Sequence, residues 1–438
     1  THTADAEGEK AHYDPIMMQT MNPNINHVLN LRWLLVLATA TAMTPVSAQT
    51  LPNGVAAGDI DQTSAVLWAR STALGTIHFE YTDGIDSFEI SFVESVVVDP
   101  TVPVKVELTN LTPGTRYSYL VTNSAGDSAG GTFQTPFEEE FHGLRFGVTG
   151  DWRGELAPYP AISNIPERDL DFFAALGDTI YADVPSVDAP LSQVRTIEDF
   201  RIKHNEVYRE RFGKNFWAAA RSSTPIFVTL DDHEVTNDFA GGASPSSDSR
   251  FDQSATYINE SELFRNGVQA FHEYNPIREE LYGDTGDPRT ANKQKLYRYR
   301  TFGSDAAIFL LDARSFRDEE LNNILNPFAN RAIRQFVEDS FDPNRTMLGQ
   351  AQFNQLTGDL FDAQAREITW KFVMVPEPIQ NLSPLVAADR FEGYAHERTR
   401  LLQFLDEHGI TNVVFVAADI HSTFINNVTY QLHPDDRQ

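Results

Sequence analysis

Four short apolar runs in this 438-residue sequence end in polar side chains that can bind cations. Carboxylates follow all four runs, and histidine stands in two of the four clusters. Because the carboxyl ends of parallel strands meet at one edge of an α/β sheet, we expect the clusters to converge. Carboxylate, imidazole and phenol groups without a thiolate suit hard or borderline cations, so the pattern predicts a metal centre. The clusters are Gly150-Asp151-Trp152-Arg153, Gly177-Asp178-Thr179-Ile180-Tyr181-Ala182-Asp183, Asp231-Asp232-His233-Glu234 and Asp419-Ile420-His421.

The overall composition excludes several kinds of partner and of chemistry. The chain has 34 basic and 62 acidic residues, a net charge of −28, so it lacks the basic excess that nucleic-acid binding requires. We therefore expect no nucleic-acid partner. The absence of cysteine excludes disulfides, Cys-ligated zinc, iron–sulfur clusters and thiol nucleophiles. The content of 41% apolar and 22% charged residues is that of an ordinary globular protein.

The elements that must position the four clusters read as an α/β domain. Continuous apolar runs alternate with helix-like stretches, which is typical of a largely parallel sheet covered on both faces. This pattern begins after residues 137–142, a linker with three consecutive glutamates, so we place the catalytic domain at residues 143–438. The expected strands are residues 144–148, 172–176, 225–230, 306–311, 370–375 and 412–417.

The region before the linker has a different pattern. Short β-rich runs and turn signals alternate every ten to fifteen residues, which indicates a small β-sandwich at residues 49–136. Its turn at residues 110–114, followed by alternating tyrosines at residues 116–121, resembles a fibronectin type III module, and we assign it no chemistry. The expected strands are residues 64–70, 76–81, 104–108 and 116–121.

Residues 1–48 read as a leader and a secretory signal peptide. Arg32 precedes an apolar run at residues 33–43, and Val46-Ser47-Ala48 is a small-x-small cleavage site. The run is shorter than the roughly 20 residues that span a bilayer. We therefore expect a secreted or periplasmic protein with no stable membrane insertion after cleavage.

The order of the four clusters resembles that of the calcineurin-like metallophosphoesterases. More narrowly, it is similar to the PhoD-type alkaline phosphatases, and the resemblance extends over about residues 51–421. It implies a four-layer α/β/β/α metallophosphoesterase sandwich. The supporting runs are residues 54–59, 66–70, 229–237, 312–317, 348–352, 389–394 and 418–421.

The resemblance further implies a binuclear or larger metal centre in which Asp178 bridges two ions. A phenolate ligand favours a strongly Lewis-acidic ion, so the first ion is expected to be Fe³⁺. An oxygen-only ligand set favours a hard divalent ion, so the second is expected to be Ca²⁺. The implied ligands are Asp151, Asp178, Tyr181 and His421 for the first ion, and Asp178, Asp232 and Asp419 for the second.

The implied reaction is hydrolysis of a small-molecule phosphate ester by a metal-bridging hydroxide that attacks phosphorus. His233 is the candidate general acid, and Asn237 and Arg153 are candidate phosphate contacts. For Arg153 an exposed salt bridge is the alternative. Asp183 and Glu234 are expected to orient the ligands.

The sequence departs from the family pattern in three places. Bacterial PhoD enzymes carry a metal-binding cysteine where this chain has Asp151, in a Gly-Asp-Trp run that looks like the purple acid phosphatase motif. The third histidine of many relatives is absent, and Glu377 is the candidate substitute. Only 17 residues follow His421, so we expect the catalytic domain to be truncated at its C-terminus.

Three functions remain open from the sequence. The first is a secreted phosphatase acting on phosphomonoesters or phosphodiesters. The second is a phospholipase D-like diesterase on the same site, and the third is a non-catalytic surface binding protein built on an inactive domain. The sequence does not indicate the oligomeric state.

Overall fold

The computed structural model describes residues 50–84 and 90–434. The expected leader and signal peptide lie outside the described residues. Everything described belongs to one unit of the chain, residues 44–438. Within the described ranges, no helix combines the length and apolar character needed to cross a membrane.

A six-stranded mixed sheet carries three of the four polar clusters. Its members are β1 (Val55–Gly58), β2 (Ala65–Ala69), β5 (Val104–Leu108), β8 (Phe146–Thr149), β9 (Phe172–Leu176) and β10 (Ile226–Thr229). They are ordered β5-β2-β1-β10-β9-β8. Strands β8, β9 and β10 are parallel, and β1 joins β10 in parallel at the Gly58–Ile226 pair. The pairs β1–β2 and β2–β5 are antiparallel. The sheet is therefore parallel from β8 to β1 and antiparallel from β1 to β5.

A second, four-stranded sheet carries the fourth cluster. It consists of β11 (Arg298–Phe302), β12 (Ala306–Leu310), β13 (Trp370–Val375) and β14 (Val413–Ala417), in that order. Strand β11 is antiparallel to β12, whereas β12, β13 and β14 are parallel.

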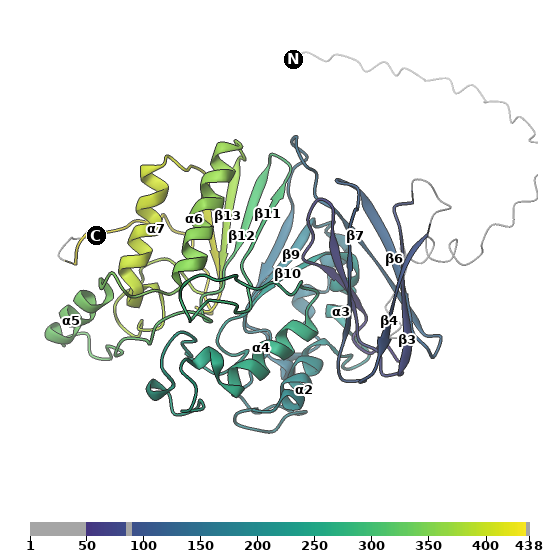
Figure 1. Ribbon diagram of the computed structural model, residues 1–438, viewed down its shortest axis with the longest axis horizontal. Helices are drawn as coiled ribbons and strands as arrows, with labels where there is room; N and C mark the ends of the chain where they lie inside the picture. Colours follow the sequence, from purple (N-terminus) through teal and green to yellow (C-terminus); the bar gives the residue numbers. More distant parts are fainter. Residues whose placement is uncertain (1–49, 85–89, 435–438) are drawn as a thin grey trace, which may run out of the picture. The chain divides into compact units, whose positions relative to one another are not determined.

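Helices pack on the outer face of each of these sheets. These helices are α2 (Ile197–Tyr208), α3 (Phe216–Ser223), α4 (Glu262–Tyr274), α6 (Gln350–Ala365) and α7 (Ala395–Glu407), while α5 (Asn330–Ser340) packs in a separate small cluster with Ile324 and Ala388. Phe173 of β9 packs among side chains of α2, α3 and α4, whereas its neighbour Phe172 faces a core that contains Met374 of β13. Val373 of β13 packs in turn against α6 and α7, which lie beside β13 in Figure 1. Because successive strand residues point to opposite faces, each sheet has one face on helices and one on the other sheet.

The remaining N-terminal strands form a separate antiparallel sheet. It consists of β3 (Gly75–Thr82), β4 (Ser91–Val97), β6 (Arg116–Thr122) and β7 (Ser128–Gln134), ordered β4-β3-β6-β7. Phe79 of β3 and Phe133 of β7 share a buried core with Leu67 of β2 and with Phe172 of β9. The N-terminal strands and the space between the two α/β sheets thus form one continuous apolar core.

Short 3₁₀ turns and capped helix starts complete the chain trace. Thr196, Asn215 and Ser261 each accept a hydrogen bond from a backbone N–H of the first turn of α2, α3 and α4, which satisfies donors that a helix N-terminus leaves free. The 3₁₀ turns are Gly154–Leu156, Pro160–Ile162, Ile165–Glu167, Pro245–Ser247, Ile258–Glu260 and Phe391–Tyr394.

Every strand expected from the sequence is present. The bounds of β5, β9 and β13 are reproduced to the residue, and the others shift by one to two residues. Four strands were not expected, namely β1, β4, β7 and β11. The structure thus has mixed α/β sheets together with an N-terminal β-rich region.

Candidate metal centre

The carboxyl ends of four parallel strands from two sheets meet at the candidate centre. Asp151 and Asp178 each lie two residues beyond the ends of β8 and β9, and Asp232 lies three beyond β10. Asp419 lies two residues beyond β14, and His421 follows it. The ends of both sheets are therefore needed to assemble the site.

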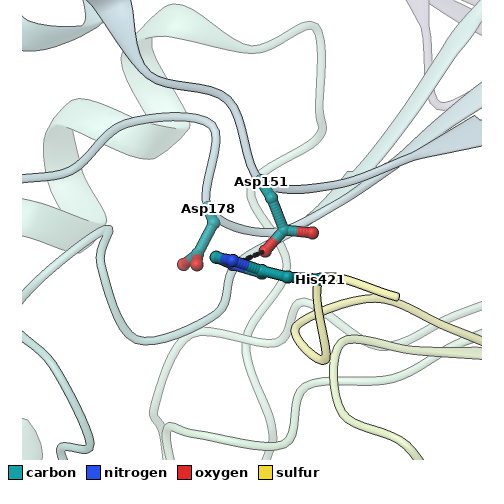
Figure 2. A group of neighbouring side chains, drawn as sticks. All are labelled: Asp151, Asp178 and His421. Carbon is teal, nitrogen blue, oxygen red and sulfur yellow. Dashed lines mark ion pairs between the residues drawn. The ribbon is translucent and has the colours of Figure 1, made fainter.

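Two groups of possible ligand atoms overlap at Asp178. In the first group, atoms of Asp151, Asp178 and His421 all lie within 4.8 Å of one another, and Figure 2 shows these side chains converging. In the second group, atoms of Asp178, Asp232 and His233 meet the same limit. A carboxylate common to two groups is the geometry of a bridging ligand. His421 Nε2 lies 3.0 Å from Asp151 Oδ1, an ion pair when the imidazole is protonated.

Four of the proposed ligands have left-handed backbone conformations. The φ angle is +64° at Asp151, +52° at Asp178, +63° at Asp419 and +51° at His421. Each costs about 1–2 kcal/mol for a residue with a side chain, and such conformations concentrate at functional sites. The protein therefore maintains four unfavourable conformations at the ends of three strands, which supports a role beyond packing.

The carboxylates of the centre lack enough cations of their own. Burial, followed by the nearby Asp232, raises the pKa of Asp178 well above its usual value. Burial also raises the pKa of Asp151, although His421 opposes this, and burial together with Asp231 raises that of Asp419 to about 8. Asp232 Oδ1 is buried without a hydrogen-bond partner. This donor set, rich in oxygen and short of positive charge, fits hard cations.

Two buried arginines, Arg314 and Arg317, lie next to the carboxylates of the centre. Arg314 pairs with Asp231 through Nε and with Glu377 through Nη2, the latter at 2.7 Å. Arg317 Nη1 also lies 2.7 Å from Glu377 Oε1. Arg314 and Arg317 are thus structural, in ion pairs with local carboxylates. Glu377, the candidate substitute for the missing histidine, is fully buried between two guanidinium groups and is not in either ligand group.

His233 is held in a defined orientation. Its Nδ1 lies 2.6 Å from Asp183 Oδ1, and its ring stacks on that of Tyr181 with the centroids 4.1 Å apart. Burial lowers the pKa of His233, but the hydrogen bond to Asp183 and the charge of Asp232 outweigh it, so the pKa is raised. With Nδ1 engaged, Nε2 is the nitrogen available to a ligand.

Tyr181 and Asp419 also lie at this site, and Asp419 belongs to neither of the two ligand groups. Burial and the neighbouring Asp178, which the phenol contacts, raise the pKa of Tyr181 above its usual value. The backbone N–H of Asp419 hydrogen-bonds to the Asp151 carboxylate.

The two candidate phosphate contacts have protein partners. Arg153 is ion-paired with Glu155, the alternative left open by the sequence, while its guanidinium carbon lies 5.5 Å from the centre of the Tyr181 ring. The Asn237 side-chain amide donates to Asp238 Oδ2 at 2.5 Å. Asn237 also lines a cavity of about 460 Å³.

Asp238 and Asp389 were missed as members of this environment. Asp389 Oδ2 lies 3.7 Å from Arg314 Nη2. Burial and the contact with Asp389 raise the pKa of Asp238 to about 7. Asp389 lies 14 residues beyond the end of β13, too far for the strand-end pattern to identify it. Its one signal in the sequence was its place in the run of residues 389–394, which supported the family resemblance.

Comparison with known proteins defines the family. The profile of the family described as "PhoD-like phosphatase" matches residues 149–438, and that of the "PhoD-like phosphatase, N-terminal domain" matches residues 38–136. The chain belongs to the PhoD-like phosphatase family.

The chain is also similar to two known proteins. The chain is 27% identical over 289 residues to "Alkaline phosphatase D" of Bacillus subtilis (strain 168), a match that covers 62% of this chain and 44% of that protein. The chain thus spans less than half the length of this curated relative. It also shares its fold with a solved structure described as "Structure of PhoD", with a TM-score of 0.69, 23% identity, and coverage of 86% of this chain and 73% of that one.

Proposed function

We propose that this protein is a metal-dependent phosphatase of the alkaline phosphatase D type, which hydrolyses small phosphate esters. The observation that carries the proposal is the pair of ligand groups that share Asp178, with all ligand atoms of each group within 4.8 Å. Membership of the PhoD-like phosphatase family supports the same reaction.

The proposed ligand sets follow the chemistry of the side chains. Asp151, Asp178, Tyr181 and His421 would hold the first ion, proposed as Fe³⁺, and Asp178, Asp232 and Asp419 the second, proposed as Ca²⁺. Once bound, the two ions would supply Lewis acidity that activates a water and stabilises charge on the phosphate.

The remaining groups of the chain bind the substrate and move protons. His233 would donate a proton from Nε2 to the leaving alcohol, while Asp183 holds the ring in place from Nδ1. Asn237 would contact the phosphate. Arg153 would do so after exchanging Glu155 for a phosphate oxygen, because both are anionic partners of a guanidinium.

A phosphodiesterase is the second candidate function. The cavity of about 460 Å³ lined by Asn237 and Asp238 offers room for an ester substituent beside the centre. A phospholipase D-like activity is one form of this candidate. A non-catalytic binding protein is less well supported, because the expected ligands Asp151, Asp178, Asp232 and His421 converge.

The architecture and the location are part of the proposal. We interpret the helices and paired sheets as the four-layer α/β/β/α sandwich, at residues 143–438, and the strands of residues 49–136 as a fibronectin type III-like sandwich. The pattern of residues 32–48 supports export by a signal peptide to the periplasm or the medium.

The test combines metal analysis with two substrates. Elemental analysis of the purified protein should find iron and calcium, and the same sample should hydrolyse an aryl phosphate monoester, a bis-aryl phosphate diester, or both. The ratio of the two rates distinguishes a monoesterase from a diesterase. A folded protein that takes up no metal and hydrolyses neither ester would refute the proposal.

Tyr181→Phe tests the iron ligand separately. A phenolate bound to Fe³⁺ absorbs visible light, so the variant should lose this absorption while the protein stays folded. An unchanged visible spectrum in the variant would show that Tyr181 is not a ligand.

A further inference from the structure

Glu234 lies buried beneath two of the strand ends that carry the proposed ligands. Its side chain is inaccessible to solvent and belongs to neither ligand group. Oε2 accepts hydrogen bonds from the backbone N–H of Asp178 at 3.0 Å and of Asp231 at 2.8 Å. Oε1 accepts from the backbone N–H and the hydroxyl of Thr179, both at 2.6 Å. One carboxylate thus receives four donors.

These donors come from two different strand ends. Asp178 and Thr179 follow β9, whereas Asp231 follows β10 and directly precedes Asp232. The two ends are also in close contact, since a Cβ on Gly177 would lie 2.5 Å from the backbone nitrogen of Asp231. The Glu234 carboxylate therefore joins the main chain that carries Asp178 to the main chain that carries Asp232.

We propose that Glu234 is a positioning residue that sets the separation of the Asp178 and Asp232 carboxylates, and thereby the affinity of the centre for metal. The inference rests on the proposed metal centre. Glu234 acts through backbone hydrogen bonds and touches neither metal nor substrate. It also helps to hold Asp178 in its left-handed conformation, with φ of +52°.

Glu397 provides a matched control in the same chain. It is also buried, and it accepts hydrogen bonds from the backbone N–H groups of Met347 and Leu348, both at 2.9 Å, and from the Thr346 hydroxyl. None of these donors belongs to a proposed ligand or to a neighbour of one in the sequence. Loss of the Glu397 carboxylate should therefore affect stability without affecting the metal centre.

The experiment compares Glu234→Gln with Glu397→Gln. A glutamine side chain accepts at only one of its two terminal atoms. In Glu234→Gln the NH₂ group faces backbone donors whichever way the amide is turned, whereas in Glu397→Gln it can face the Thr346 hydroxyl, which can also accept. Mn²⁺ serves as the probe ion, and its affinity is measured by equilibrium dialysis at buffered free Mn²⁺, with urea unfolding of the metal-free chains alongside. Because ligand-orienting groups are worth about 10- to 100-fold in metal affinity, Glu234→Gln should weaken Mn²⁺ binding by that factor.

The control decides the interpretation. Glu397→Gln should lower the urea midpoint by less than Glu234→Gln does, and it should bind Mn²⁺ as the wild type does. Equal Mn²⁺ affinity in Glu234→Gln and Glu397→Gln would overturn the inference while leaving the metal centre intact. If the metal-free wild type binds neither Mn²⁺ nor the proposed Fe³⁺ and Ca²⁺, the metal centre is overturned, and the inference with it; if it binds Ca²⁺ but not Mn²⁺, the same comparison is made with Ca²⁺.

A milder pair of variants covers the case in which Glu234→Gln does not fold. Thr179→Val removes one hydroxyl donor to Glu234, and Thr346→Val removes the corresponding donor to Glu397. The inference requires the first to weaken Mn²⁺ binding and the second to leave it unchanged. The same affinity in both valine variants would contradict it.

Discussion

Two buried charged clusters in this protein have opposite balances of charge. In the first, the Asp59 carboxylate lies just beyond β1 and is surrounded by three arginines. Arg298 Nε and Arg300 Nη2 each lie 2.8 Å from an oxygen of this carboxylate. The backbone N–H of Arg278 donates a third hydrogen bond at 3.0 Å. In the second, the metal centre, several carboxylates share two arginines, Arg314 and Arg317, which Asp231 and Glu377 already engage.

The pKa values of Asp59 and Asp178 shift in opposite directions because the two clusters differ in their balance of charge. Burial alone would raise the pKa of Asp59, but Arg298, Arg300 and Arg278 outweigh it and hold the pKa well below its usual value. Burial and neighbouring carboxylates raise the pKa of Asp178. Equal burial therefore has opposite outcomes, because the number of nearby guanidinium groups decides the sign. The Asp59 cluster is a closed structural contact between the N-terminal strands and β11, whereas the centre is short of cations.

The largest effect is expected for Asp178→Asn. The variant should lose at least one ion, and hydrolysis should fall by more than the roughly 100-fold that an orienting residue alone is worth, because both ligand groups lose a shared member. The metal-free variant should also unfold at higher urea than metal-free wild type, since the buried Asp178 carboxyl must take up a proton on folding or keep a repelled charge, and asparagine does neither. Full metal content with normal turnover would show that the surplus of carboxylates is not a metal site.

The opposite pattern is expected for Asp59→Asn. Breaking a buried ion cluster should lower the free energy of unfolding by about 3–5 kcal/mol, while the metal content per folded chain stays unchanged. Urea unfolding and elemental analysis measure the two quantities. The control is Asp169→Asn, which removes an exposed pair with Arg116 at 3.4 Å and should cost at most about 1 kcal/mol. A loss of metal in Asp59→Asn would mean that the two clusters are coupled.

The pH dependence of stability should also separate the clusters. In metal-free protein, Asp419, with a pKa of about 8, binds a proton in the folded state that the unfolded chain releases near pH 4. Stability from this group is therefore full below about pH 4 and decreases by up to about 1.4 kcal/mol per pH unit as the pH rises towards 8. Asp59 has the opposite sign, because its contribution is present above about pH 4 and is lost only in acid.

Urea titrations of the chelator-treated chain between pH 5 and 8 measure the slope. Asp419→Asn should reduce the slope, with Asp238 and other carboxyls of the centre supplying the remainder, whereas Asp59→Asn should leave it unchanged. A slope that the Asp419 substitution does not alter would locate the proton uptake elsewhere.

The smallest effect is expected at Glu155, the ion-pair partner of the partly exposed Arg153. Glu155→Gln would free Arg153 for phosphate, and an exposed pair is worth about 0–1 kcal/mol, so KM should fall by no more than about 5-fold with kcat unchanged. Arg153→Gln should raise KM instead. If neither substitution moves KM, Arg153 is not a phosphate contact.

The sequence determined the elements whose cause is local. Two apolar runs flanked by polar residues were predicted as strands, at residues 172–176 and 370–375. They form β9 and β13 with the same bounds. The polar clusters behind the strands were visible for the same reason, because parallel strands place their carboxyl ends together. The proximity of Asp151 and Asp178, which follow adjacent strands of one sheet, was therefore predictable without coordinates, whereas the approach of His421 from the second sheet depends on how the two sheets pack.

Only the tertiary structure decided which buried carboxylates are paired with arginines. Strand β11 was not predicted because Arg298 and Arg300 interrupt its apolar pattern, and they are accommodated there by Asp59, more than 200 residues away. Asp389 joins the centre from a long connection, and Glu377 is engaged by two arginines instead of being available to a metal. Local patterns specify strands and their ends, but ion pairing at long sequence separation depends on which side chains the fold brings within a few ångströms.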